Sequence, residues 1–275
     1  MKVFPRVLLT KFDKPPGGTL HLSYSEPIGL CYLAAYLRDN GIECHIAHLF
    51  CESGYKALRK IIVDFQPDII GFSVRNFNYP MTVNYIREVQ REFPDIRIAL
   101  GGECITTANA VNIGESTNID VIFFNDGEHS FFEYVSGAEL SSIPGIAYKY
   151  AQGEYRLSTI PEKCIDITRL PMMARDDLPM DKYTSEGFKN LKYATMHVQR
   201  GCRYRCTFCH TAGRYKLVCS RTVDQILDEI DFLIDRYGIE AIAIWDEDFF
   251  ADTERVKGII AGLRSQQFIT SQLYV

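Results

Sequence analysis

The first 150 residues alternate short apolar segments with amphipathic ones, and this alternation limits the possible fold more than any other feature of the chain. Apolar residues at helical spacing predict helices. Strands that alternate with helices in this way pair in parallel, so the sequence predicts an α/β fold with a doubly wound parallel sheet. The predicted strands are 6–10, 42–49, 69–74, 96–100 and 120–124, and the predicted helices are 27–41, 55–65, 81–93 and 108–113.

The carboxyl ends of these strands carry small and polar residues, in the loops 15–18, 73–77, 101–103 and 126–128. In parallel α/β sheets, ligands bind at this edge, where the strand order reverses. Glycines there let the backbone approach a ligand, but glycines also end many strands because turns require them, so both interpretations stay open. No G-x-G-x-x-G follows the first strand and no G-x-x-x-x-G-K-[ST] occurs, which excludes these nucleotide-binding motifs.

The pattern changes after the fifth strand. Residues 146–157 predict a hairpin, and residues 159–192, rich in proline and charge, predict a linker. We therefore expect a first domain over residues 1–145, a hairpin and linker over 146–192, and a second domain over 193–275.

A second series of strands and helices begins with a strand over 193–198. Thr222 and Gln225 have the spacing of a capping box at the start of a helix that Gly238 ends. Further along, the sequence predicts a strand, a helix and a last strand, over 239–245, 253–263 and 268–275.

Three of the nine cysteines, Cys202, Cys206 and Cys209, lie within eight residues. Because no signal peptide is expected at the start of the chain, disulfides are disfavoured and the three thiols indicate a metal site. Arginines flank the cysteines at 200, 203 and 205, and positive charge favours the thiolate form that binds metal. The other six cysteines lack ligand spacing and are expected to be small buried side chains.

The Cys-x3-Cys-x2-Cys spacing leaves three interpretations open. An iron-sulfur cluster can be held by three cysteines, which leaves one iron open for a ligand. Zinc can take the same cysteines together with His210, although structural zinc sites usually combine two short ligand groups. The third interpretation is a group of cysteines that binds no metal.

Composition excludes several other classes of protein. Apolar residues make up 47% and charged residues 24% of the chain, as in globular proteins. The net charge of −5 argues against generic binding to nucleic acids. The longest apolar runs are far shorter than the roughly 18 residues needed to span a bilayer, so we expect a cytoplasmic protein without a membrane partner.

The segment YATMHVQRGCRYRCTFC, residues 193–209, resembles the signature of radical S-adenosylmethionine (SAM) enzymes. The resemblance implies that Cys202, Cys206 and Cys209 bind a 4Fe-4S cluster whose open iron chelates the methionine part of SAM. It places Phe208 near the adenine of SAM. It also implies that the acidic segment 245–249, with Asp246 and Glu247, contacts SAM, whereas without the resemblance these acids would simply cap the following helix.

The N-terminal segment EPIGLCYLAAYLRDNG, residues 26–41, resembles cobalamin-binding radical SAM proteins, and segments 67–73, 101–103, 126–128 and 170–183 follow in the expected order. The resemblance implies a flavodoxin-like cobalamin-binding domain. Loop positions alone assign the cobalamin contacts Ser73, Gly101, Gly102, Gly127 and Glu128. Cys104 stands where this family usually has histidine, and the cobalt-binding motif Asp-x-His-x-x-Gly is absent. We therefore expect none of the histidines at 21, 45, 48 and 129 to bind cobalt.

The resemblance implies an enzyme that reductively cleaves SAM for methyl transfer or a related radical transformation. Its partners would be a small-molecule or natural-product substrate and an electron donor such as flavodoxin or ferredoxin. Only 82 residues follow Tyr193, fewer than a complete radical SAM (β/α) barrel needs, so we expect a C-terminally truncated chain with a partial barrel. The alternatives are a cobalamin- or cluster-binding module without turnover of its own, and a zinc-stabilised α/β protein.

Overall fold

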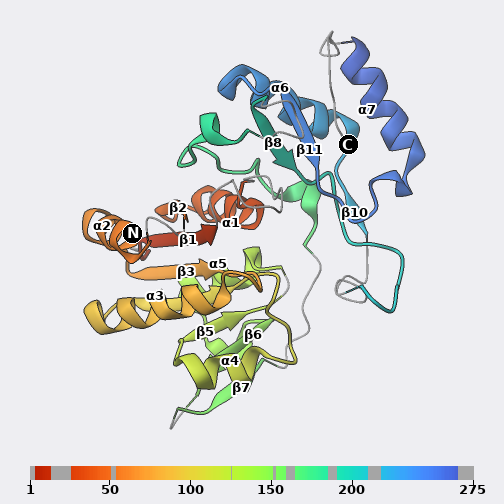
Figure 1. Cartoon of the computed structure of the whole chain (residues 1–275). Helices are drawn as coiled ribbons and strands as arrows, with labels where there is room; N and C mark the ends of the chain where they lie inside the picture. The colour runs from red at the N-terminus through yellow and green to blue at the C-terminus, as the bar shows by residue number, and fades with distance from the viewer. Residues whose placement is uncertain are drawn as a thin grey trace. The chain divides into compact units, whose positions relative to one another are not determined.

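The computed structural model describes residues 4–13, 26–50, 54–124, 126–150, 153–158, 165–184, 191–209 and 218–265, which fall into two compact units (Figure 1). Unit 1 holds the described residues of Met1–Pro15 and Gly29–Lys163, together with Met173–Leu178. Unit 2 holds those of Pro16–Ile28, Cys164–Met172 and Pro179–Val275.

Unit 1 is built on a seven-stranded sheet with the strand order β2-β1-β3-β4-β5-β6-β7. The first five strands pair in parallel, which confirms the predicted doubly wound α/β fold, and their order 2-1-3-4-5 is that of flavodoxin-like proteins. The strands are β1 (Val7–Asp13), β2 (Cys44–Phe50), β3 (Ile69–Ser73), β4 (Arg97–Gly101), β5 (Val121–Phe123), β6 (Ile146–Lys149) and β7 (Tyr155–Leu157).

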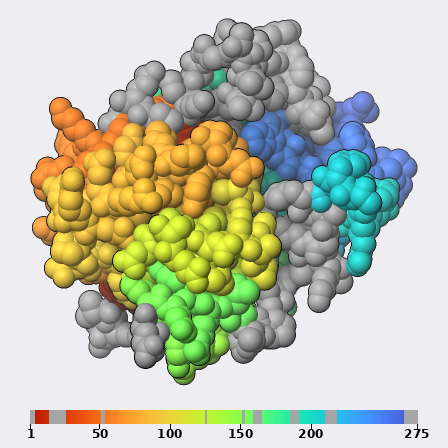
Figure 2. Space-filling view, turned by 60° about the horizontal axis from the view of Figure 1, so that its bottom comes forward, coloured from red at the N-terminus to blue at the C-terminus, as the bar shows by residue number. Residues whose placement is uncertain are grey.

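Five helices cover the two faces of this sheet: α1 (Ile28–Asp39), α2 (Gly54–Phe65), α3 (Tyr79–Glu92), α4 (Ala110–Thr117) and α5 (Glu128–Val135). Helices α2, α3 and α4 enclose the main apolar core against the strands, with side chains such as Leu58 and Ile86 fully buried. Figure 2 shows this side, with α3 in orange-yellow and α4 in yellow-green. Helices α1 and α5 share the opposite face, where Tyr36 packs edge-on against Phe132 at 5.9 Å between ring centroids.

The predicted hairpin is confirmed as β6 and β7, which pair antiparallel. It also extends the main sheet, because β6 pairs antiparallel with β5 in the register Val121↔Tyr148. Short-range sequence patterns predict a hairpin but do not show which strand it joins.

Part of the segment predicted as a linker is instead packed into unit 1. Arg175 is only 1% exposed, and the Asp177 carboxylate accepts a hydrogen bond of 2.9 Å from the backbone N–H of Ile46 in the outer strand β2. The Arg38 side chain bonds the same carboxylate and donates to the carbonyl of Cys44 at 2.8 Å. The segment therefore covers part of the free edge of β2, which its proline-rich and charged composition does not reveal.

Unit 2 contains a parallel pair of strands, β8 (Tyr193–Met196) and β11 (Ala241–Ile244), with α6 (Val223–Tyr237) between them in sequence and α7 (Thr253–Ser265) after them. The capping box of Thr222 and Gln225 is confirmed, and Gly238 ends α6 with a φ of 62°. Two short strands, β9 (Gln199–Arg200) and β10 (Cys219–Ser220), pair antiparallel. The strand predicted over 268–275 lies outside the described residues.

Helices α6 and α7 pack closely through glycines. A methyl group on Gly262 would lie 2.2 Å from Leu227, and one on Gly258 would lie 2.9 Å from Val223.

None of the helices in the described part of the chain is both long and apolar enough to cross a membrane.

Candidate functional site

The carboxyl edge of the unit 1 sheet brings together residues from four strands. The register places Lys11 of β1 opposite both His48 of β2 and Ser73 of β3, and Ser73 opposite Gly101 of β4. The strand order reverses between β1 and β3. Ligands usually bind at this point in such folds. Strand β1 continues to Asp13, beyond the predicted end at residue 10, so two charged residues that sequence reasoning missed belong to the edge.

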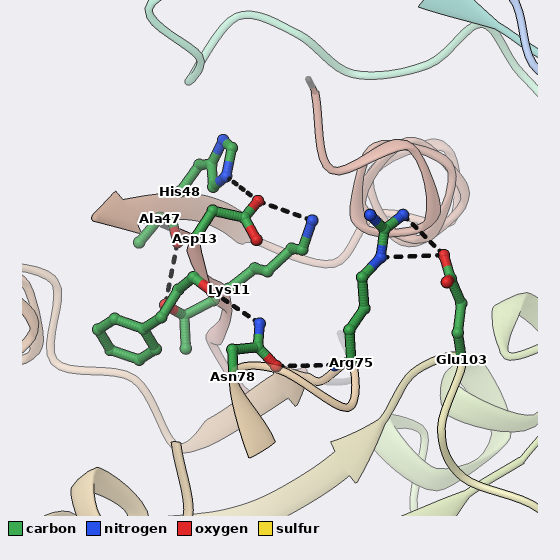
Figure 3. A network of polar contacts seen from close by, with 9 residues as sticks. Lys11, Asp13, Ala47, His48, Arg75, Asn78 and Glu103 are labelled. Carbon is green, nitrogen blue, oxygen red and sulfur yellow. Dashed lines mark hydrogen bonds and ion pairs between the residues drawn. The ribbon is translucent and has the colours of Figure 1, made fainter. Parts of the chain in front are cut away.

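Lys11, Asp13 and His48 form a buried network at this edge (Figure 3). The Lys11 ammonium and the His48 Nε2 atom each lie 2.8 Å from Asp13 Oδ2. The side chains of Lys11 and His48 are 5% and 0% exposed. Burial alone would raise the pKa of Asp13, but the hydrogen bond with His48 and the charge of Lys11 lower it to about 2. Burial lowers the pKa of Lys11.

Asn78, Arg75 and Glu103 link β1 to the segments that follow β3 and β4 (Figure 3). Asn78 donates to the carbonyl of Phe12 at 2.7 Å and accepts from the backbone N–H of Arg75 at 2.7 Å. The Arg75 guanidinium donates to Glu103 at 2.7 and 3.1 Å. The sequence pattern singled out the loops 73–77 and 101–103 but not these contacts, because Phe12 and Glu103 are distant in the sequence from Asn78 and Arg75.

The three glycines singled out at this edge differ in their surroundings. Gly102 has a φ of +126°, and a methyl group there would lie 2.1 Å from the Val74 carbonyl oxygen, so close backbone packing requires glycine. A methyl group on Gly101 would make an ordinary contact of 3.6 Å with Phe123. A methyl group on Gly127 would have no other atom within 4 Å. Gly127 precedes the buried Glu128, which begins α5.

The histidines that were not expected to bind cobalt have other partners where the structure describes them. His48 pairs with Asp13, and His45 Nδ1 lies 3.0 Å from Asp177. His129 lies 3.6 Å from Glu133 on α5. His21 and the loop 15–18 lie outside the described residues.

The three clustered cysteines lie on a loop that begins directly after β9. Cys206 and Cys209 are exposed, Cys202 is half-buried, and the backbone N–H of Cys209 donates to the carbonyl of Cys206 at 3.0 Å. Phe208 is 90% exposed. We call residues 201–209 the cysteine loop.

Within the described ranges, no three His, Cys, Asp or Glu side chains are grouped closely enough to hold one metal ion. A cluster places each thiolate on a separate iron, and three soft sulfur donors on an accessible loop fit that chemistry. His210, the additional ligand of the zinc interpretation, lies outside the described residues.

The acidic segment follows β11, and we call residues 245–249 the acidic loop. Asp246 Oδ1 accepts backbone hydrogen bonds from Val198 at 2.9 Å and Gln199 at 3.1 Å. Its side chain is 0% exposed, and the buried Oδ2 has no hydrogen-bond partner among the described residues. Glu247 is exposed. Asp246 therefore bonds the backbone between β8 and β9 through one oxygen, and its other oxygen is buried without a hydrogen-bond partner among the described residues.

The cysteine loop and the acidic loop are also linked to each other. Arg203 Nε lies 3.4 Å from Asp248 Oδ2. The Gln199 amide nitrogen donates to the carbonyls of Gly201 and Asp248, and its oxygen accepts from Arg255. The sequence gives no local signal for Gln199 or Arg255, because their partners come from different loops.

Two family models match the chain. The model described as B12 binding domain matches residues 22–135, and the model described as Radical SAM superfamily matches residues 196–270. The first match includes the polar carboxyl edge of unit 1 except for Lys11 and Asp13, and the second includes the cysteine loop and the acidic loop.

Curated relatives match most of this chain. An uncharacterized methyltransferase, PH0819, from Pyrococcus horikoshii is 26% identical over 245 residues, which cover 87% of this chain and 52% of that protein. Cytidylyl-2-hydroxyethylphosphonate methyltransferase from Streptomyces wedmorensis is 23% identical over 288 residues, which cover 86% of this chain and 54% of that protein. The chain thus spans about half the length of these relatives.

A solved structure has the same fold. The cobalamin-dependent SAM radical enzyme OxsB, determined with aqua-cobalamin bound, aligns with a TM-score of 0.75 and 20% identity over 98% of this chain and 38% of that one. OxsB has also been determined with both aqua-cobalamin and SAM, and that structure aligns equally well. The similarity extends over both units of the fold.

Proposed function

Since the chain carries a B12-binding domain followed by a partial radical SAM domain, we propose that it is the cofactor-binding portion of a cobalamin-dependent radical SAM methyltransferase. The observation that carries the proposal is the placement of the motif Cys-x3-Cys-x2-Cys. It begins just after the first strand of a β8-α6-β11 unit, in a chain whose other unit has a flavodoxin-like sheet. Curated relatives named as methyltransferases support the type of reaction.

We assign the thiolates of Cys202, Cys206 and Cys209 as the ligands of a 4Fe-4S cluster. The exposure of Cys206 and Cys209 supports the assignment, because an accessible loop can take up a cluster without unfolding the core. A reduced cluster held by these thiolates would supply the electron for reductive cleavage of SAM, and cobalamin would carry the methyl group.

We assign Asp246, Glu247 and Phe208 to the binding of SAM. One buried carboxylate oxygen of Asp246 has no hydrogen-bond partner within the described ranges. Such an oxygen fits an acceptor for the α-ammonium group of SAM. Phe208 is exposed and can cover the adenine ring.

We assign the carboxyl edge of unit 1 to cobalamin, with contacts from Ser73, Gly101, Gly102, Gly127 and Glu128. Ser73 and Gly101 share one row of the sheet, and a methyl group on Gly127 would meet no atom within 4 Å. Gly102 contributes its backbone, since its missing side chain is explained by packing against Val74. The buried Lys11, Asp13 and His48 would hold the floor of this site rigid.

We further propose that the whole protein methylates a small molecule, such as a natural product, and takes its electron from a flavodoxin or ferredoxin. The matched relatives include enzymes named for a cytidylyl-phosphonate substrate and for a carbapenam substrate. A reducing cytoplasm, which keeps thiols free, suits the cluster.

The proposal is tested by anaerobic reconstitution of the 275-residue chain with iron and sulfide, followed by addition of cobalamin. We expect an electron paramagnetic resonance signal of the reduced cluster that changes when SAM is added, and a visible spectrum of bound cobalamin. Cys202→Ala, Cys206→Ala and Cys209→Ala should each lose the cluster. Cys219→Ala, outside the cysteine loop, serves as the matched control and should keep it.

The outcomes separate the alternative functions. Tight binding of zinc with no SAM-sensitive iron signal would contradict the proposal and favour a zinc-stabilised protein. Release of 5′-deoxyadenosine from SAM under reducing conditions would show that the chain itself turns over. Cluster and cobalamin without 5′-deoxyadenosine would identify a binding module that needs further protein for turnover.

A further inference from the structure

Gln199 forms a buried bridge between the two loops at the carboxyl ends of β8 and β11. Its side chain is 1% exposed, and its amide nitrogen donates to the carbonyl of Gly201 at 3.1 Å and to that of Asp248 at 3.3 Å. Gly201 directly precedes Cys202, and Asp248 belongs to the acidic loop. One side-chain amide therefore bonds the backbone of both loops, and buried bonds of this kind fix loop positions strongly.

Arg255, in the first turn of α7, holds Gln199 in place. Its Nη2 atom donates to the Gln199 side-chain oxygen at 3.1 Å and to the carbonyl of Phe249 at 3.2 Å. The second bond reaches the acidic loop, so Arg255 also contributes to the bridge directly. The two side chains form one network behind the cysteine loop and the acidic loop.

The Arg255 guanidinium forms no ion pair with a carboxylate in the described part of the chain. The residue is 6% exposed, its Nε and Nη1 atoms are buried without hydrogen-bond partners, and no carboxylate is paired with it. A buried guanidinium without an anionic partner is costly. An anionic group bound nearby would offset that cost.

We propose that Gln199 and Arg255 are positioning residues of the radical SAM unit. Gln199 fixes the cysteine loop against the acidic loop, and Arg255 supplies positive charge that favours an anionic group bound at these loops. The inference rests on the proposed function for the identity of that group, which is either the thiolate-ligated cluster or the carboxylate of SAM. Neither residue is assigned as a cluster ligand.

The charge is tested with Arg255→Met, Arg255→Lys and the control Arg264→Met, which removes an exposed arginine from the last turn of the same helix. Each variant is reconstituted, its iron content is measured, and its reduced cluster is titrated with SAM and with reductant. All variants should assemble the cluster, because the three cysteines are intact.

Two results distinguish the source of the anion. If the anion is the carboxylate of SAM, Arg255→Met needs about tenfold more SAM for the half-maximal spectral change, at an unaltered midpoint potential. If it is the cluster, the midpoint potential falls in the absence of SAM, because positive charge stabilises the reduced form. Arg255→Lys should recover part of either effect. An Arg255→Met variant with the SAM affinity and potential of Arg264→Met would overturn the role of the charge.

The bridge is tested in the cofactor-free chain, where the result does not depend on the proposed function. Hydrogen–deuterium exchange of peptides covering 199–206 and 246–252 should be faster in Gln199→Leu and Gln199→Glu than in Arg264→Met. Gln199→Glu preserves the size of the side chain and the acceptor for Arg255, but it removes the donors to Gly201 and Asp248. Unchanged exchange in both variants would overturn the bridge. Faster exchange in a chain that assembles no cluster would support the bridge and contradict the proposed function.

Discussion

At the scale of single residues, Asp13 is the centre of the polar edge of unit 1. Its Oδ2 atom lies 2.8 Å from both the Lys11 ammonium and His48 Nε2. Breaking a buried charge pair by removing one partner is far more costly than replacing both, because the remaining charge stays buried and unpaired. The edge should therefore depend strongly on this one carboxylate.

We expect Asp13→Asn to lower the free energy of unfolding by about 3 kcal/mol, because Lys11 would lose its anionic partner. Urea denaturation of the cofactor-free chain measures the change. Asp64→Asn, on the exposed side of α2, is the control and should change stability by less than about 0.5 kcal/mol. The double variant Lys11→Met/Asp13→Asn should regain part of the loss. Equal stabilities of Asp13→Asn and Asp64→Asn would contradict the importance of the network.

The same carboxylate predicts how stability depends on pH. The pKa of Asp13 is about 2 in the folded chain and 3.8 without its partners. A group whose pKa is lower in the folded state contributes its full stabilisation above its unfolded pKa and loses it as pH falls. The stability difference between wild type and Asp13→Asn should thus shrink as the pH falls from about 4 to about 2. Denaturation curves of both proteins at each pH measure this difference. A difference that stays constant or grows as the pH falls would contradict the prediction.

The residues that were predictable from sequence are those whose signal is local. The three cysteines stand out because their spacing is a local pattern, although their role as metal ligands stays a prediction. The Asp13–His48 contact is not, because it joins residues 35 positions apart. Lysine and aspartate after an apolar run indicate a loop, and only the partner in β2 explains why β1 continues through them.

At the scale of elements, the close approach of the backbone just after β3 and β4 depends on Gly102. Its φ of +126° is strained for other residues, and a methyl group would lie 2.1 and 2.6 Å from the oxygen and nitrogen of Val74. These atoms belong to the backbone, so they cannot move aside as a flexible side chain would.

We therefore expect Gly102→Ala to destabilise unit 1 by about 3 kcal/mol, from overpacking together with backbone strain. Gly29→Ala, at an exposed position in α1 with nothing within 4 Å, should instead stabilise by about 0.5–1 kcal/mol. Thermal unfolding of both variants measures the two effects. A Gly102→Ala variant that melts like wild type would mean that the Val74 backbone shifts easily.

The order of helices and strands was predictable because hydrophobic periodicity is a property of short windows of sequence. The capping box at Thr222 and the hairpin of β6 and β7 were predictable for the same reason. The junction between β5 and β6 was not, nor was the packing of Arg175 and Asp177, because both depend on contacts with distant parts of the chain. The short-range pattern therefore determines which elements form, and tertiary contacts determine how the sheet is completed.

At the scale of the whole molecule, the two units carry different parts of the proposed chemistry. The B12-binding match ends at residue 135 and the radical SAM match begins at 196, so no residue belongs to both. The two cofactors should therefore load independently.

We expect Cys206→Ala to lose iron and sulfide while it binds cobalamin with an unchanged dissociation constant. Cobalamin titration followed by visible absorption, together with iron analysis of the same sample, measures both quantities. Cys219→Ala should retain both cofactors. Loss of cobalamin together with the cluster would show that the two sites are coupled and would contradict independent loading.

The cover that the segment Met173–Leu178 gives to strand β2 also has a consequence during protein synthesis. Strand β2 is an outer strand, and outer strands are templates for pairing with other chains. Asp177, which bonds Ile46, leaves the ribosome well after the last strand of the sheet, β7, has been made. The nascent sheet can thus complete its seven strands while this edge is still open. For that interval the outer strand lacks this cover, and the fold gains its own protection once the segment Met173–Leu178 has emerged.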